Sequence, residues 1–93
     1  MNWGRSLMEK HEQFLHETLA SVMELDPDLV SCDTSFSEQG VDSLVGLRFA
    51  RKIKDGLAVE FDPEWLYDYP TIVQLANFLD TYLHSSIQAP EAR

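Results

Sequence analysis

The chain has 93 residues, of which 44% are apolar, and it carries 16 acidic against 7 basic residues for a net charge of −9. This length allows one domain with a small core, and the composition is that of a globular rather than a disordered protein. The acidic charge argues against nucleic acid as a partner, because phosphate binding requires Lys and Arg. Acidity alone is also explained by solubility.

A single cysteine, Cys32, excludes an internal disulfide and a metal site built from cysteines. No apolar run reaches the ~20 residues that span a bilayer, and the N-terminal sequence MNWGRSLMEK lacks the apolar centre of a signal peptide. We therefore expect a cytoplasmic protein with no membrane partner.

The first helix is predicted from Ser6 to about Leu25. Ser6 and Glu9 match the S-x-x-E capping box. Pro27 disfavours the helical conformation at the residue before it and should end the helix. The apolar residues that recur on one face of this helix are Met8, Leu15, Leu19 and Val22.

Residues 26–42 are predicted to form a long loop, rich in Asp, Ser and Gly. Loops longer than ~12–15 residues are uncommon in compact domains and are often functional. The apolar side chains that could hold this loop against the core are Leu29, Val30 and Phe36.

The second helix is predicted from about Ser43 to Lys54. Asp42 is a suitable N-cap, and its charge also favours the positive end of the helix dipole. Gly56 is expected to stop the helix. The residues expected to face inward are Leu44, Leu47 and Ile53.

A short helical turn is expected through Trp65, Leu66 and Tyr67, with Pro63 at its start and Pro70 after its end. The last helix begins at a second capping box, from Thr71 to Gln74. Its buried stripe is expected to contain Ile72, Leu75, Ala76, Leu79 and Leu83.

The predicted fold is therefore all-α: a four-helix bundle of three main helices and one short helix, with the long loop between the first two main helices. Residues 1–93 are expected to form one domain with an ordered core of about residues 6–84. The terminal tails, including the C-terminal sequence SSIQAPEAR, are expected to be flexible.

The segment Gly40-Val41-Asp42-Ser43-Leu44 places a serine where the long loop meets the N-terminus of a helix. The first turn of a helix has unpaired N–H groups and a partial positive charge, so a phosphate attached there is stabilised. Gly40 allows the backbone to turn sharply. Ser43 is expected to be exposed, because the helix is expected to bury Leu44 and Leu47 instead.

At these residues the chain resembles the acyl carrier protein family, whose attachment motif is Asp-Ser-Leu, usually preceded by Gly-x. Residues 67–72, with Leu75 and Ala76, are similar to the signature [FY]-[DE]-x-P-T-[IV]-x-x-L-A of carrier domains from modular polyketide and peptide synthases. The resemblance covers roughly residues 7–83. It also includes the end of the first helix, Leu25-Asp26-Pro27, and the aromatic residue Phe36.

The resemblance implies a carrier fold and a protein without catalysis of its own. It implies that a phosphopantetheinyl transferase joins 4′-phosphopantetheine from coenzyme A to the Ser43 hydroxyl, with Asp42 and Leu44 completing the attachment motif. The terminal thiol would hold an acyl group as a thioester and deliver it to partner active sites at high effective concentration. The alternative is that Ser43 is an ordinary serine at a helix N-terminus.

Among carriers, the resemblance favours a polyketide synthase type, as in antibiotic and other secondary metabolism. Peptidyl carriers usually have Gly-Gly-x-Ser, whereas Asp42 precedes Ser43 here, and fatty acid carriers usually have a strongly acidic second helix. Some polyketide carriers that undergo β-branching have Trp six residues after the serine, where this chain has Phe49. Unlike the acidic second helix of fatty acid carriers, the second predicted helix of this chain contains 4 of the 7 bases: Arg48, Arg51, Lys52 and Lys54. Fatty acid and nonribosomal peptide carriers remain the alternatives.

Partner contact is expected at Val41, Leu44 and Val45, which are apolar and lie beside the attachment serine. The expected partners are the transferase and polyketide synthase enzymes such as a ketosynthase and an acyltransferase, with the chain itself a monomer. The basic residues that could dock on an acidic enzyme surface, or simply form a solvated helix face, are Arg48, Arg51 and Lys52.

Two other functions compete with that of a carrier. A hydrolase is disfavoured because Ser43 lacks the G-x-S-x-G turn and its preceding strand. His11 and His16 lie five residues apart, which places them on different helix faces and makes a shared metal improbable. The main rival is an unmodified helical interaction domain, whose anchors would be Trp3, Trp65, Tyr67 and Tyr69.

Overall fold

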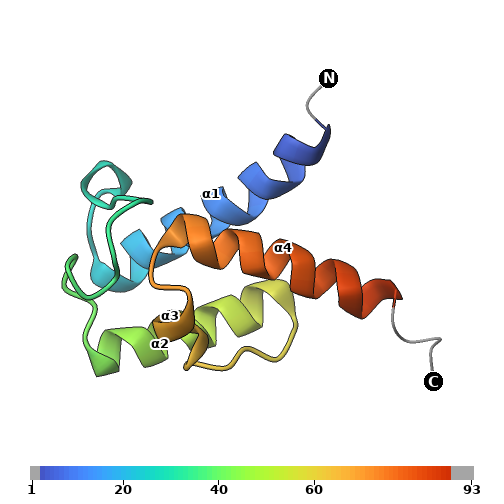
Figure 1. Cartoon of the computed structure of the whole chain (residues 1–93). Coiled ribbons are helices and arrows are strands. Elements are labelled where there is room, and N and C mark those ends of the chain that lie inside the picture. Colours follow the sequence, from blue (N-terminus) through green and yellow to red (C-terminus); the bar gives the residue numbers. More distant parts are fainter. Residues whose placement is uncertain (1–2, 89–93) are drawn as a thin grey trace.

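A computed structural model describes residues 3–88 of the chain, with side chains from residue 11 to residue 83. Within that part of the chain every regular element is helical, which confirms the predicted all-α fold (Figure 1). The elements are α1 (Trp3–Met23), the 3₁₀ turn η1 (Pro27–Leu29), α2 (Ser43–Leu57), α3 (Trp65–Asp68) and α4 (Ile72–Gln88).

Helix α1 begins at Trp3, so the predicted start at Ser6 is wrong. No proline stands in residues 3–5 to block the helix, and it continues past the capping sequence. The side chains of four residues named in the predictions lie outside the described part of the chain: Trp3, Ser6, Met8 and Glu9.

The C-terminus of α1 is closed two residues earlier than predicted. Glu24 adopts a left-handed conformation with φ 59°. Its N–H donates to the carbonyl of Ser21 over 3.1 Å, and the N–H of Leu25 donates to the carbonyl of Ala20 over 2.9 Å. This pair of bonds is the Schellman arrangement, which satisfies the last carbonyls of a helix.

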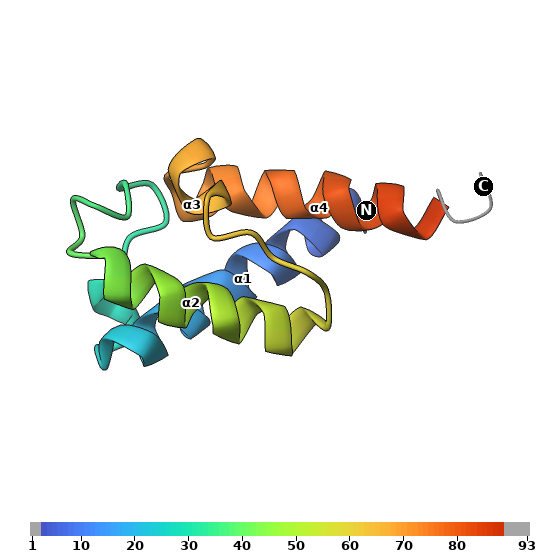
Figure 2. The ribbon, with the colours of Figure 1, turned by 90° about the horizontal axis from the view of Figure 1, so that it is seen from below.

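The core lies between α1, α2 and α4, and α1 packs against both of the others (Figure 2). The predicted stripes of α1 and α4 are confirmed at their centres, whereas Val22 and Leu83 are only half-buried. The largest fully buried side chains are Phe49, Leu15, Leu19, Ile53, Ile72, Leu75 and Leu79.

The inward face of α2 differs from the prediction. Leu44 and Leu47 are 58% and 56% exposed, so their predicted burial is wrong, whereas Ile53 is buried as expected. Each helical residue turns about 100°, and the observed stripe leaves Leu44 and Leu47 on the outer side. The buried residues of α2 are Gly46, Phe49, Ala50 and Ile53.

Gly56 does not stop α2, which continues to Leu57. Ala58 takes the left-handed cap instead, with φ 56°, and its N–H donates to the carbonyl of Lys54. Gly56 serves packing: a Cβ there would lie 2.5 Å from Cζ of Phe14 on α1. The missing side chain therefore allows α1 and α2 to approach closely.

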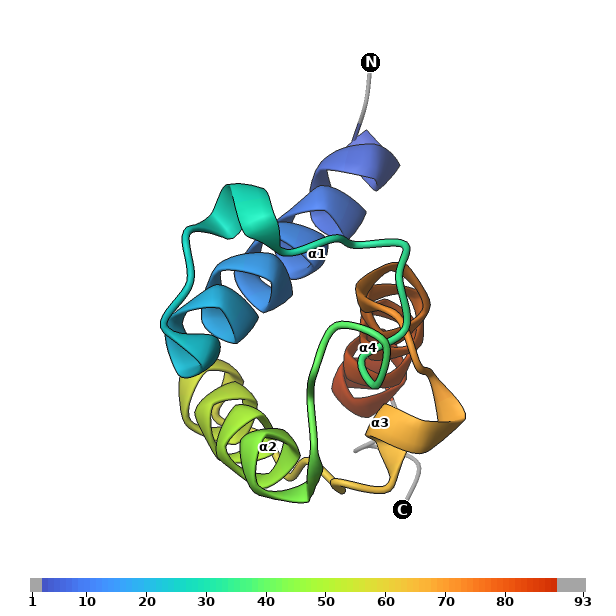
Figure 3. The same ribbon diagram turned by 90° about the vertical axis from the view of Figure 1, so that its left-hand side faces the viewer.

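The segment from residue 26 to residue 42 crosses the end of the bundle where α2 begins (Figure 3). Val30 and Phe36 are buried as predicted, but Leu29 is 69% exposed. Leu29 belongs to η1, a 3₁₀ turn that buries none of its residues, and its predicted contact with the core is therefore wrong.

The short helix α3 forms where it was predicted, and side-chain hydrogen bonds stand just before both α3 and α4. The Oδ1 atom of Asp62 accepts a 2.9 Å hydrogen bond from the N–H of Glu64, just before α3. The Oγ1 atom of Thr71 accepts a 3.1 Å bond from the N–H of Gln74, which confirms the Thr71 half of the predicted capping box. The Oε1 atom of Gln74 accepts from the hydroxyl of Thr71 over 3.1 Å, in place of the backbone N–H that a capping box would use. Helix α4 continues to Gln88, and residues 89–93, part of the predicted flexible tail, lie outside the described residues.

None of the helices in the described residues is long and apolar enough to cross a bilayer.

Candidate phosphopantetheine attachment site

Ser43 is the first residue of α2, and it is exposed. Asp42 has the extended backbone of an N-cap, and its Oδ1 atom accepts a 2.9 Å hydrogen bond from the N–H of Val45. The predicted cap is thus confirmed. The exposure of Ser43 is confirmed too, although Leu44 beside it is also exposed. The serine therefore stands at the positive end of the helix dipole, open to solvent.

The backbone reverses sharply just before this cap. Gly40 has φ +102°, a conformation that favours glycine. The N–H of Gly40 donates to the carbonyl of Ser37 over 3.1 Å, and the N–H of Val41 donates to the carbonyl of Phe36 over 2.9 Å. The predicted turn at Gly40 is confirmed, and it aims the chain from the loop into α2.

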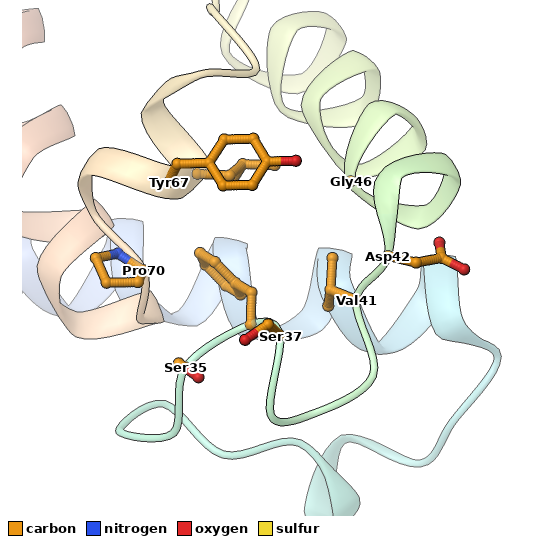
Figure 4. Close-up of a pocket in the computed structure, with 9 residues that line it drawn as sticks. Ser35, Ser37, Val41, Asp42, Gly46, Tyr67 and Pro70 are labelled. Atoms are coloured by element: carbon orange, nitrogen blue, oxygen red, sulfur yellow. The ribbon is translucent and has the colours of Figure 1, made fainter.

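A pocket with a volume of about 120 Å³ opens beside the cap, between the loop, α2 and α3 (Figure 4). Gly46 lies in its wall, where a Cβ would be in ordinary van der Waals contact with Cδ1 of Leu66 at 3.5 Å and Cγ1 of Val41 at 3.8 Å. Tyr67 extends from α3 toward α2 and is 71% exposed. The lining residues are Ser35, Phe36, Ser37, Val41, Asp42, Gly46, Leu66, Tyr67 and Pro70.

Sequence reasoning missed this pocket. A glycine at the centre of a helix and an aromatic four residues before a capping threonine were visible in the sequence, at Gly46 and Tyr67. Neither signal tells which distant segments meet, since the pocket is lined by residues from 35–46 on one side and from 66–70 on the other. Of the predicted site residues, Val41 and Asp42 line the pocket.

The outer face of α2 combines apolar and basic side chains. Leu44 is exposed and Val45 is half-buried. Every Lys and Arg between residues 11 and 83 lies on α2. Of these four basic side chains, Lys54 forms an ion pair among the described residues, with Glu60 at 3.9 Å. The remaining basic residues are exposed: Arg48, Arg51 and Lys52.

The two histidines considered as metal ligands, His11 and His16, lie on α1 and not beside Ser43. The Nε2 atom of His16 is hydrogen-bonded to the carbonyl of Val30 at 2.8 Å. The Nδ1 atom of His11 lies 3.8 Å from Oδ1 of Asp80 on α4. The two histidines thus face different parts of the structure, as their spacing predicted. Within the described residues, no three His, Cys, Asp or Glu side chains gather as metal ligands would.

Cys32 lies half-buried in the loop, and its pKa is raised to about 11. Burial is the main cause, because it disfavours the charged thiolate. The carboxylate of Glu12 adds repulsion and a hydrogen bond, and Asp33 adds further repulsion. The thiol is therefore mostly protonated and weakly nucleophilic near neutral pH.

The chain matches a known family of protein domains. The family described as "Phosphopantetheine attachment site" matches residues 13–79, and the match includes the whole of α2 and the pocket beside it. The chain belongs to this family. The predicted resemblance to carrier domains is thereby confirmed.

Synthases and a solved carrier protein structure are also similar to this chain. The chain is 34% identical to polyketide synthase PksL of Bacillus subtilis over 73 residues, 78% of this chain and 2% of PksL. It is 34% identical to malformin synthetase mlfA of Aspergillus homomorphus over 65 residues, 70% of this chain and 1% of that protein. A free-standing peptidyl carrier protein from Acinetobacter baumannii has a TM-score of 0.77 and 30% identity, covering 82% of this chain and 95% of that one.

Domains of this family are sites for covalent 4′-phosphopantetheine and are non-catalytic components of synthases. The predicted cofactor, carrier fold and non-enzymatic class are therefore confirmed. The similar proteins include a polyketide synthase and a peptidyl carrier protein, so the chain is a carrier of the phosphopantetheine type, with the polyketide and peptidyl kinds not distinguished. It spans only about 2% of the length of PksL and about 1% of malformin synthetase.

Proposed function

We propose that this carrier holds acyl intermediates of polyketide biosynthesis as thioesters on 4′-phosphopantetheine joined to Ser43. The observation that supports Ser43 is its exposed position as the first residue of α2, directly after the Asp42 cap. A phosphodiester at this position would lie near the free N–H groups and the positive dipole of the helix. The residue type, the exposure and the electrostatics all suit the group.

The chain itself needs no general base for the loading step. A phosphopantetheinyl transferase would join the Ser43 oxygen to the phosphorus of the pantetheine phosphate, and the nucleotide part of coenzyme A would leave. The protein supplies an ordered, accessible hydroxyl. When bound, the cofactor supplies the thiol that forms a thioester with the acyl group. The pocket lined by Val41 and Tyr67 lies beside the point of attachment.

The polyketide assignment is supported by Asp42 before the serine and by the similarity to PksL. A peptidyl carrier is the second candidate, because the Acinetobacter peptidyl carrier protein is 30% identical to this chain, close to the 34% identity of PksL. Carriage of fatty acid intermediates is the third, and the basic residues of α2 count against it.

Two surfaces beside Ser43 suit partner enzymes. Leu44 is an exposed apolar residue next to the serine, and Val41 and Val45 are half-buried beside it. An enzyme that receives the arm, such as a ketosynthase or an acyltransferase, would meet these side chains. Arg48, Arg51 and Lys52 would face acidic residues of such a partner. A monomeric state and a cytoplasmic location stay predictions from the sequence.

The test is to incubate the purified protein with coenzyme A and a transferase of broad specificity, and to measure its intact mass. A carrier gains one phosphopantetheine, and Ser43→Ala abolishes the gain. Ser37→Ala is the matched control, because Ser37 is an exposed serine in the neighbouring loop. No gain of mass by the native protein would favour an unmodified interaction domain. Loading from malonyl- or aminoacyl-coenzyme A, followed by transfer assays, separates the polyketide and peptide assignments.

A further inference from the structure

The segment that delivers Ser43 has little regular structure of its own. From Val30 to Asp42 no helix or strand supports the chain. Backbone bonds tie it to the α3–α4 junction: the N–H of Phe36 donates to the carbonyl of Pro70 over 2.8 Å, and the N–H of Val73 donates to the carbonyl of Cys32 over 3.1 Å. Those two backbone bonds fix the middle of the segment to the rest of the fold. The turns within the segment need further hydrogen bonds to keep their shape.

The side chain of Gln39 supplies that support. Its Oε1 atom accepts a 2.8 Å hydrogen bond from the N–H of Ser31. Its Nε2 atom donates to the carbonyl of Ser31 over 2.7 Å and to the carbonyl of Thr34 over 2.9 Å. One half-buried amide thus satisfies three backbone groups that have no other hydrogen-bond partner among the described residues. Its pairing with both groups of Ser31 has the form of a strand-to-strand contact.

Only an amide side chain can make this set of bonds. A carboxylate of the same length could accept from the N–H of Ser31, but it has no hydrogen to donate to the two carbonyls. A methionine of similar length could make none of the three. Gln39 is therefore required for its chemistry as well as for its size.

Gln39 is also directly connected to the attachment site. It precedes Gly40, where the chain reverses, and Ser43 follows four residues after it. Its own backbone N–H donates to the carbonyls of Ser35 and Phe36, both at 3.1 Å, and both of these residues line the pocket beside α2. Loss of the side-chain bonds would free the pocket wall and the turn, while the local cap of α2 by Asp42 would remain.

We propose that Gln39 is a positioning residue for the modification of Ser43. It holds the loop in the one shape that a transferase recognises together with the serine. This inference rests on the proposed function of Ser43 as the attachment point. Because Gln39 does not touch the reacting atoms, its loss should weaken productive recognition of the protein more than the chemical step.

The experiment compares Gln39→Met and Gln39→Glu with the native protein. Gln13→Met is the matched control, because Gln13 is an exposed glutamine on α1 that bonds only to Glu17 among the described groups. Three quantities are measured well below the melting temperature of each variant: hydrogen exchange of the amides in residues 31–41, and the KM and kcat of phosphopantetheine transfer.

For both Gln39 variants we expect faster exchange in residues 31–41 and a KM for the carrier raised about five- to tenfold, with kcat changed less than about twofold. Gln13→Met should match the native protein in all three. A native KM in a variant whose loop has lost protection would overturn the positioning role while leaving Ser43 as the attachment point. Native hydrogen-exchange rates in Gln39→Met would overturn the inference that the side chain of Gln39 holds the loop in shape.

The two proposals fail separately. If the native protein is never loaded, the proposed function is wrong, whatever the loop does. If it is loaded and the Gln39 variants show native KM values, only the role of Gln39 is wrong. A fall of kcat alone, with KM unchanged, would also contradict positioning.

Discussion

The N–H of Phe36 donates a 2.8 Å hydrogen bond to the carbonyl of Pro70, and this bond joins the middle of the long loop to the junction between α3 and α4. The ring of Phe36 points the other way, into the core, where it meets Phe49 edge-on with a centroid distance of 5.6 Å. One residue therefore fixes the loop both to α3 and to α2, and so fixes both walls of the pocket beside Ser43.

Phe36→Ala should destabilise the fold severely. Removal of a buried phenylalanine costs about 3–5 kcal/mol, a large part of the 5–15 kcal/mol that stabilises a typical domain. Urea unfolding followed by circular dichroism measures the loss. Leu29→Ala is the control from the same loop, and because Leu29 is 69% exposed its effect should stay below about 0.5 kcal/mol. Equal losses in the two variants would show that Phe36 does not anchor the loop.

Asp42→Ala should lower the free energy of unfolding by about 1 kcal/mol, because it removes the side-chain acceptor for the N–H of Val45. Asp42→Asn keeps an acceptor and should recover most of that loss. The Ala variant should also be loaded more slowly at Ser43. Denaturant unfolding and the rate of mass gain measure both effects.

The matched control for the cap is Asp55→Ala at the other end of α2. A negative charge there opposes the helix dipole, so its removal should not destabilise the protein. The capping role is refuted if Asp42→Ala unfolds at the native denaturant concentration.

Reversing the charge of Arg48 and Arg51 to Glu should slow acyl transfer with at least one synthase partner by about tenfold, while Ser43 can still be loaded. Exposed charges act mainly on the rate of association, and the difference should shrink as salt is added. Transfer rates at low and physiological ionic strength measure this. Lys54→Glu is the control, because Lys54 lies 3.9 Å from Glu60 and further from Ser43 along α2. Unchanged rates with every cognate partner would remove the docking proposal.

Cys32 should react slowly with iodoacetamide at pH 8. Its pKa is raised from 9.0 to about 11, first by burial and then by Glu12. A raised thiol pKa means less thiolate at a given pH, here about a hundredfold less than at the ordinary value. Glu12→Gln removes a negative charge and a hydrogen bond, and should speed alkylation.

Glu17→Gln is the control for Cys32, because Glu17 is an exposed acid on the same helix. Alkylation of the native protein as fast as that of the urea-unfolded chain would contradict the raised pKa. A slow Cys32 would also allow the thiol of an attached arm to be labelled selectively.

The features that the sequence predicted correctly are mostly local. The caps at Asp42 and Thr71 depend on side chains within three residues of the N–H groups that they satisfy. The core stripe of α4 from Ile72 to Leu79 recurs every three to four residues, so periodicity identified it. The turn at Gly40 follows from the conformational freedom of glycine.

The features that it missed depend on tertiary contacts. Leu44 and Leu47 are as apolar as the buried residues of α2, and only the packing of α1 and α4 shows which face is covered. Gly56 resembled a helix stop, but its role is to accommodate Phe14 of another helix. The three bonds of Gln39 join residues five and eight positions apart in an irregular loop, where no periodic pattern exists.

The most direct test of the account is to locate the modification within the loaded protein. The protein is treated with coenzyme A and a transferase, digested, and sequenced by tandem mass spectrometry. We predict a single phosphopantetheine on Ser43, with the neighbouring serines of the loop, Ser35 and Ser37, unmodified. A phosphopantetheine on any other residue, or a Ser43→Ala variant that still gains the group, would contradict the assignment of Ser43 as the carrier's attachment point.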